Sequence, residues 1–162
     1  MESNLQILAI VPCGKEKIWD RKPKAGETEA KDAYVGASFR VNKSFAEKVA
    51  DRWIILSAKY GFIDPNFVIS GNYNVSFKDP STDPVDTEIL EEQLREKNLS
   101  GYDFVIALGG KDYTSIVKEV FQSVSRVVAP AEGLPLGRAM GYLKSLSQYE
   151  KEEILKRMGI KF

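Results

Sequence analysis

The fold class follows from the stretch Leu5-Gln6-Ile7-Leu8-Ala9-Ile10-Val11, which runs directly into Pro12-Cys13-Gly14-Lys15. A nearly continuous apolar run, ended by proline and glycine, is typical of a strand that is buried on both faces of a parallel sheet. The next segment, Lys15 to Tyr34, has no apolar period and is rich in basic residues. It predicts a long basic loop, and a loop of that size in a compact domain is usually functional or mobile.

Apolar runs and helical patterns alternate along the rest of the chain. Further strands are predicted at Trp53 to Leu56, Phe104 to Leu108 and Arg126 to Ala129. Helices are predicted at Ser38 to Asp51 with Ser38 as the N-cap, Val85 to Asn98, Tyr113 to Gln122, Gly137 to Leu146 and Gln148 to Met158. A turn is predicted at Asp64-Pro65-Asn66, and a short strand or extended segment at Val68 to Phe77. This order indicates a single α/β domain over residues 1–162, with a mostly parallel four- to five-stranded sheet flanked by helices.

The composition narrows the classes of function. The 23 basic and 23 acidic residues balance, which argues against binding nucleic acid by overall charge but leaves a local basic patch open. The chain has no histidine, so it lacks the commonest metal ligand and the usual general base, and we expect no metal and no cofactor. Its single cysteine precludes an internal disulfide. No apolar run approaches the roughly 20 residues that span a bilayer, and the N-terminus lacks a basic signal-peptide start, so the sequence predicts a cytoplasmic protein.

Polar or glycine-bearing segments follow the predicted strands. They are Pro12-Cys13-Gly14-Lys15, Ser57-Ala58-Lys59-Tyr60-Gly61, Gly109-Gly110-Lys111-Asp112 and Ala131-Glu132-Gly133-Leu134-Pro135. Ligands of open parallel sheets bind outside the carboxyl ends of the strands. We therefore expect the four segments to converge on one crevice.

Two of these segments carry candidate reactive groups. Lys59 is a candidate phosphate ligand or amine nucleophile, or else a solvated lysine in a turn. Cys13 is a candidate nucleophile because Lys15 and Lys17 would lower the pKa of its thiol, although a small buried thiol is the ordinary use of a lone cysteine. Gly14 offers backbone amides to an anion.

The other two segments offer an anion site and a carboxylate. Gly109 and Gly110 lie between a strand and a helix, where free amides favour phosphate, or where they simply form a tight turn. Glu132 is the best-placed general base, with Asp64, Asp32 and Asp112 as rivals that also suit helix or turn capping. Tyr34 either stacks on a planar ligand or covers the sheet edge.

The sequence resembles an uncharacterised domain family of bacteria, archaea and phages that is related to the YaaA peroxide-stress proteins. The resemblance rests on Pro12-Cys13-Gly14-Lys15-Glu16-Lys17, on Tyr34, and on Leu56 to Pro65 followed by Tyr73. The residues that match the YaaA pattern are Leu56, Ser57, Tyr60, Gly61, Asp64 and Tyr73. Lys59 is not part of that pattern. The resemblance to YaaA implies DNA binding and protection from oxidative DNA damage. The core domain of archaeosine synthase, which modifies a deazaguanine in transfer RNA, has a similar Pro-Cys start, and the histidine that follows there is missing here.

The leading hypothesis is a small enzyme that acts on a nucleobase, nucleotide or nucleic acid, by base modification or at an N-glycosidic bond. The alternatives are a non-catalytic DNA-binding module and a nucleotide-sensing domain, as a monomer or small homo-oligomer. The candidate catalytic residues are Cys13, Lys59, Asp64 and Glu132. The candidate substrate-binding residues are Gly14, Lys15, Lys17, Tyr34, Ser57, Tyr60, Gly61, Tyr73, Gly109, Gly110 and Lys111.

Overall fold

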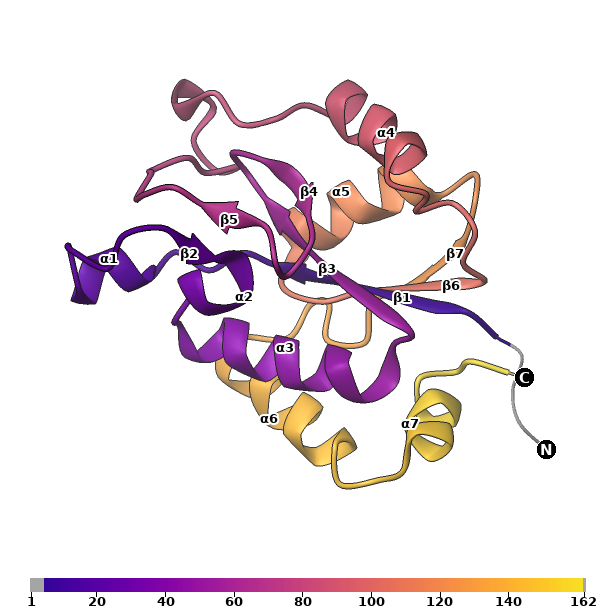
Figure 1. The fold of residues 1–162 in the computed structure, drawn as a ribbon. Coiled ribbons are helices and arrows are strands. Elements are labelled where there is room, and N and C mark those ends of the chain that lie inside the picture. The colour runs from indigo at the N-terminus through magenta and orange to yellow at the C-terminus, as the bar shows by residue number, and fades with distance from the viewer. Residues whose placement is uncertain (1–4, 162) are drawn as a thin grey trace.

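The computed structural model describes residues 5–161 and shows one five-stranded sheet between two layers of helices (Figure 1). The strand order is β4-β3-β1-β6-β7, with β1 in the centre. The strands are β1 (Ile7–Pro12), β3 (Arg52–Ser57), β4 (Gly61–Ile63), β6 (Phe104–Ala107) and β7 (Arg126–Val128). All neighbours pair in parallel except β3 and β4, which form an antiparallel hairpin. The expected α/β class and mostly parallel sheet are therefore confirmed.

Helices cover both faces of the sheet. The face drawn below the sheet in Figure 1 carries α3 (Ala37–Val49), α6 (Leu136–Leu146) and α7 (Lys151–Arg157). The face above it carries α4 (Thr87–Glu96) and α5 (Lys111–Phe121). None of the helices within residues 5–161 is long and apolar enough to cross a membrane.

The alternation of side chains along β1 explains why the sheet needs both layers. Ile7, Ala9 and Val11 pack into the core on the side of α3, α6 and α7. Leu8 and Ile10 pack into a second core on the side of α4 and α5. The β1 residues from Ile7 to Val11 are each at most 1% exposed, as the continuous apolar run predicts for a central parallel strand.

The prediction of a long basic loop from Lys15 to Tyr34 is wrong in that the segment contains regular structure. This segment contains α1 (Ile18–Arg21), β2 (Thr28–Glu29) and α2 (Ala30–Ala33), and β2 pairs with β5 (Val68–Ile69) in a separate two-stranded sheet. The elements are short and depend on distant partners. Strand β2 pairs with β5 about 40 residues further along the chain, and within the segment the buried Trp19 indole donates a hydrogen bond to the Gly26 carbonyl at 3.0 Å. Pattern reading cannot find such elements because they are shorter than the periods that it detects.

Three smaller expectations also change. The short strand expected at Val68 to Phe77 is limited to β5, and a 3₁₀ helix (Pro80–Thr82) follows it. Strand β4 is not predicted from the sequence, because its three residues read as part of a turn. Ser38 is not the N-cap of α3, since Gly36 occupies that position and no side chain caps the helix. The turn after Asp64 is confirmed by a hydrogen bond from the Phe67 amide to the Asp64 carbonyl at 3.0 Å.

Candidate functional site

The candidate site lies where the chain reverses its direction across the sheet. From β1 the chain passes to β3 on one side, and it later returns to β6 on the other side of β1. Open α/β sheets bind their ligands at such a switch point, outside the carboxyl ends of the two strands. The turns that leave these ends are Pro12-Cys13-Gly14 and Gly109-Gly110, and they are held close together. A Cβ atom added at Gly109 would lie 2.5 Å from Cγ of Pro12.

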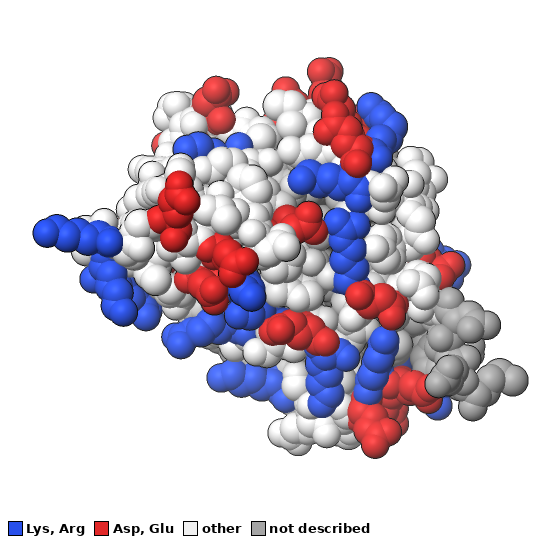
Figure 2. Space-filling model, viewed as in Figure 1, with Lys and Arg blue, Asp and Glu red and all other residues white. Residues whose placement is uncertain are grey.

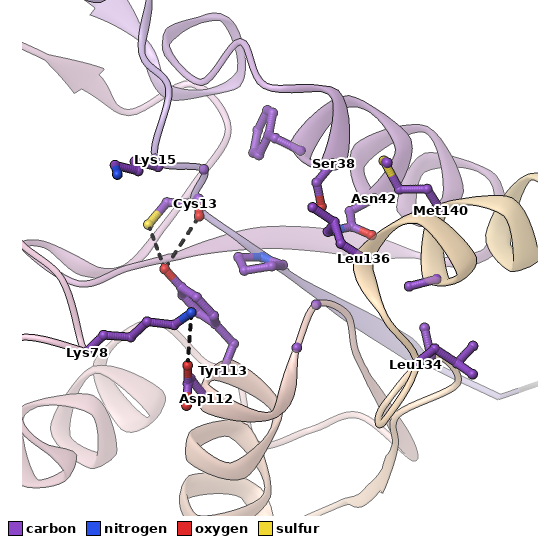
Figure 3. Close-up of a pocket in the computed structure, with 17 residues that line it drawn as sticks. Cys13, Lys15, Ser38, Asn42, Lys78, Asp112, Tyr113, Leu134, Leu136 and Met140 are labelled. Atoms are coloured by element: carbon purple, nitrogen blue, oxygen red, sulfur yellow. Dashed lines mark hydrogen bonds and ion pairs between the residues drawn. The ribbon is translucent and has the colours of Figure 1, made fainter.

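Two adjoining cavities open at this edge. The smaller, of about 370 Å³, lies between the two turns and the starts of α3, α5 and α6, with Ser38, Asn42, Leu136 and Met140 among its lining residues (Figure 3). The larger, of about 920 Å³, extends toward α1 and the segment after β5 and is lined by residues that include Lys17, Asp20, Asn72 and Tyr73. The residues that line both are Cys13, Gly14, Lys15, Lys78 and Tyr113.

Cys13 lies where the two cavities meet. Its Sγ is 3.4 Å from the Tyr113 hydroxyl, which also donates a hydrogen bond to the Cys13 carbonyl at 3.4 Å (Figure 3). Burial raises the pKa of the Cys13 thiol, while the Tyr113 hydrogen bond and the charge of Lys17 oppose that rise. The thiol therefore carries its proton at neutral pH unless a neighbouring base removes it.

Lys17 is the buried cation of the site. It is 7% exposed, and no other charged residue among those described is buried. Its Nζ donates to the Lys15 carbonyl at 3.3 Å and lies 4.4 Å from the centre of the Tyr73 ring. Burial lowers the pKa of Lys17, and the nearby Cys13 and Asp20 raise it. Burial therefore makes Lys17 lose its proton more readily than a solvated lysine does.

Three tyrosines, Tyr34, Tyr73 and Tyr113, lie near enough to Cys13 for its charge to act on their phenols. The Tyr73 hydroxyl is hydrogen-bonded to the Tyr34 hydroxyl and lies 3.1 Å from Oγ of Ser57. Ser57 in turn accepts hydrogen bonds from the amides of Lys59 and Tyr60. Burial raises the pKa of Tyr73 to about 12, and it also raises the pKa values of Tyr34 and Tyr113. These phenols are therefore hydrogen-bonding groups at neutral pH and not bases.

Only some of the expected site residues line a cavity. Those that do are Cys13, Gly14, Lys15, Lys17, Tyr73, Gly109 and Gly110. Lys111 follows Gly110 as the first residue of α5 but lines neither cavity. The segment Ser57 to Gly61 is predicted in the crevice, and it lies outside both cavities, behind Tyr73. Tyr34 is buried beneath Tyr73 at 2% exposure, so it does not offer a free face for stacking.

Three candidate catalytic residues, Lys59, Asp64 and Glu132, lie outside the cavities and contact other side chains. Lys59 is exposed, with Nζ 5.2 Å from the ring centres of Tyr60 and Tyr73. Asp64 forms an ion pair with Arg52 at 3.1 Å. Glu132 forms one with Lys118 of α5 at 2.9 Å, which ties the loop before α6 to α5. Their proposed roles in catalysis stay predictions, and their positions favour the lining residues instead.

Among the lining residues that sequence reasoning missed are Lys78, Tyr113 and Asn42. Lys78 comes from a segment with no pattern, and Tyr113 reads only as the start of a helix. Asn42 carried a readable signal, because it occupies the buried face of α3 together with Phe39 and Phe45. A polar residue inside such an apolar stripe is uncommon unless its amide has a partner or faces a site.

A model of a family of unknown function, DUF6884, matches residues 8–145. The chain belongs to the DUF6884 family. Among its relatives is the uncharacterized protein YfjM of Bacillus subtilis (strain 168), which is 35% identical over 147 residues, 90% of this chain and 96% of the relative. No solved structure matches the chain. The DUF6884 match spans the lining residues of both cavities and ends before α7, so the cleft is part of the family's shared domain.

The tyrosine network predicts a loss of stability at alkaline pH. Unfolding returns each phenol to its ordinary pKa of 10.0, whereas the folded Tyr73 ionises near 12. The unfolded state then binds fewer protons above pH 10, so the contribution of Tyr73 to the free energy of unfolding is constant below pH 10 and falls between pH 10 and about 12. Melting temperatures measured from pH 8 to 12 should show this fall. The Tyr73→Phe variant should show a shallower fall than the wild type. The exposed control Tyr142→Phe should follow the wild-type curve, and identical curves for all three would contradict the assignment.

Proposed function

We propose that the cleft binds a nucleotide or a nucleobase of a nucleic acid and that the protein is an enzyme acting on it, by base modification or at an N-glycosidic bond. The observation that carries the proposal is the junction of the two cavities at the switch point of the sheet, with Cys13 at its centre. The larger cavity is lined by Tyr73, Tyr113 and Lys17. The smaller lies at the starts of α3, α5 and α6, and no side chain in the described part of the chain caps these helices. Together they suit a ligand with a flat ring at one end and an anionic group at the other.

The chemistry that we propose uses Cys13 and Lys17 as a pair. At an N-glycosidic bond, the neutral form of Lys17 accepts the thiol proton, and the thiolate forms a bond to the anomeric carbon while the bond from that carbon to the base breaks. The Lys17 ammonium protonates the departing base, and water then displaces the sulfur from the anomeric carbon and returns a proton to it. Tyr113 orients the sulfur through its hydroxyl at 3.4 Å. This assignment replaces the missing histidine by an amine whose pKa is lowered by burial.

The family resemblance supports a role with nucleic acid. The resemblance to YaaA proteins implies DNA binding, and the resemblance to the archaeosine synthase core domain implies a modified base in RNA. Both share with this chain residues that line the cleft or support it: Cys13 with archaeosine synthase, and Tyr73 with YaaA. The proposal therefore extends what these two resemblances have in common to the cleft of this chain.

The second candidate is a DNA-binding module without catalysis. It is favoured by the exposed Lys15, which lines the larger cavity, and by the exposed Arg21, Lys22 and Lys24, which follow the lining residue Asp20 in the chain. Elsewhere on the face shown in Figure 2, basic and acidic side chains are mixed, and no single basic surface covers it. The mixed surface favours a small ligand or one nucleotide of a polymer over extended electrostatic binding.

A substrate screen tests the two candidates together. The purified protein is incubated with nucleosides, nucleotides, single strands and duplexes, and mass spectrometry identifies any released or modified product. Release or modification of a base supports the enzyme. Binding of polymers that weakens steeply with salt and leaves the strand unchanged supports the DNA-binding module. Absence of both binding and turnover across the whole set rejects both.

A further inference from the structure

Three helices begin at the smaller cavity. Residues from the first turns of α3, α5 and α6 line it: Ser38 and Phe39, Asp112 and Tyr113, and Leu136 and Ala139. Among residues 5–161, no side chain caps any of these helices. The first intrahelical hydrogen bonds are donated by Arg40, Tyr113 and Ala139, so the amides that precede them have no acceptor in the described part of the chain. Uncapped amides and three helix dipoles therefore point their positive ends toward one space.

Asn42 supplies an independent observation at the same place. The residue is 4% exposed, and it lines the smaller cavity from the second turn of α3 (Figure 3). No hydrogen bond to its amide group is formed by any residue that the structure describes. Buried amides in folded proteins nearly always have partners, so an orphan that borders a cavity indicates that a ligand or water completes it.

The charged side chains around the smaller cavity also favour an anion. Lys15 and Lys78 line it, and Asp112 is the carboxylate among its lining residues. Asp112 is neutralised by Lys78, with Nζ and Oδ2 3.5 Å apart. The lining thus carries a net positive charge, which favours an anion in addition to the amides.

We propose that the smaller cavity is a phosphate site, in which the Asn42 amide and the free amides at the starts of α3 and α5 donate to the phosphate oxygens. The site rests on the proposed function, because it assigns the phosphate of a nucleotide to the smaller cavity and its ring to the larger one. Cys13, at the junction, then faces the sugar between them. The substrate class is accordingly a nucleoside phosphate or a phosphorylated strand end, and not a free base.

Inorganic phosphate is the probe that tests the site alone. Its affinity is measured by titration of the ¹⁵N-labelled protein, with a matched pair of variants, Asn42→Asp and Asn66→Asp. Both put a carboxylate in place of an amide, but Asn66 is exposed and lines neither cavity. Loss of the Asn42 hydrogen bond and added repulsion should weaken phosphate binding about 10-fold or more. Asn66→Asp should bind within about twofold of the wild type.

The wild-type titration keeps the test valid if Asn42→Asp fails to fold. Phosphate should shift the amide resonances of Ser38, Phe39, Lys111 and Asp112. Shifts confined to the exposed lysines of the α1 region, equal affinity in both variants, or no saturable shift would overturn the phosphate site.

The phosphate site and the proposed function fail in different ways. If nucleosides bind and are processed but phosphate does not bind, the site is wrong and the function stands. If phosphate binds at these amides but no nucleoside, nucleotide or nucleic acid binds, the site stands and the function is wrong.

Discussion

The Gly109→Ala variant should lose about 3 kcal/mol of unfolding free energy, through backbone strain and overpacking. Gly109 has a φ of +95°, a conformation that residues with a Cβ rarely adopt. The added carbon would also lie 2.5 Å from Cγ of Pro12, which belongs to the central strand and cannot move aside easily. Urea unfolding monitored by circular dichroism measures the change.

Gly110 provides the control for this substitution. It is the next residue in the same turn, with a φ of −82°, and a Cβ added there would meet no atom within 4 Å. Gly110→Ala should therefore change the unfolding free energy by less than about 0.5 kcal/mol. Equal stability of the two variants would contradict the close approach of the β1 and β6 turns, on which the geometry of the cleft depends.

The Cys13→Ala variant should lose about 100-fold or more of the turnover of whichever substrate the screen identifies. The expected size is that of removing a nucleophile, and the fold should survive because the side chain is small and lies at a cavity. Initial rates and melting temperatures of wild type and variant are compared at the same pH. Lys17→Met should lower the rate as well, since it removes the acceptor of the thiol proton.

Two further variants separate this assignment from the alternatives outside the cleft. Lys59→Ala and Glu132→Gln should retain turnover within about threefold, because both side chains lie outside the cavities and pair with neighbours. A Cys13→Ala enzyme with wild-type rates, or loss of turnover in Lys59→Ala or Glu132→Gln with the fold intact, would move the chemistry away from Cys13.

Strands β1, β3, β6 and β7 and the position of the cleft were predictable from the sequence. Apolar runs such as Leu5 to Val11 need burial on both sides, and parallel strands align their carboxyl ends at one edge. For this reason the turns at Cys13 and Gly109 meet as expected. Asp64 and Glu132 follow strands in the same way, but each forms an ion pair with its nearest basic neighbour instead of entering a cavity.

The short elements before α3 and the remaining lining residues depend on tertiary contacts, which leave no local pattern in the sequence. The residues of α1 and β2 form their structure against Gly26 and β5, and not by their own propensity. Lys78 reaches the cleft only because the chain after β5 folds back toward Tyr113 and Asp112. Asn42 borders a cavity because α3 packs beside α6, and the apolar pattern of one helix does not specify which helix packs beside it.

The central claim is that a nucleotide fills the cleft over Cys13. Cys13 is the chain's only cysteine, so alkylation by iodoacetamide gives one mass increment that mass spectrometry can follow over time. The claim predicts that a saturating concentration of the best-binding nucleotide slows this alkylation about 10-fold or more, while the same concentration of sodium chloride does not. An unchanged alkylation rate in the presence of a nucleotide that demonstrably binds would show that the ligand lies elsewhere and would contradict the account.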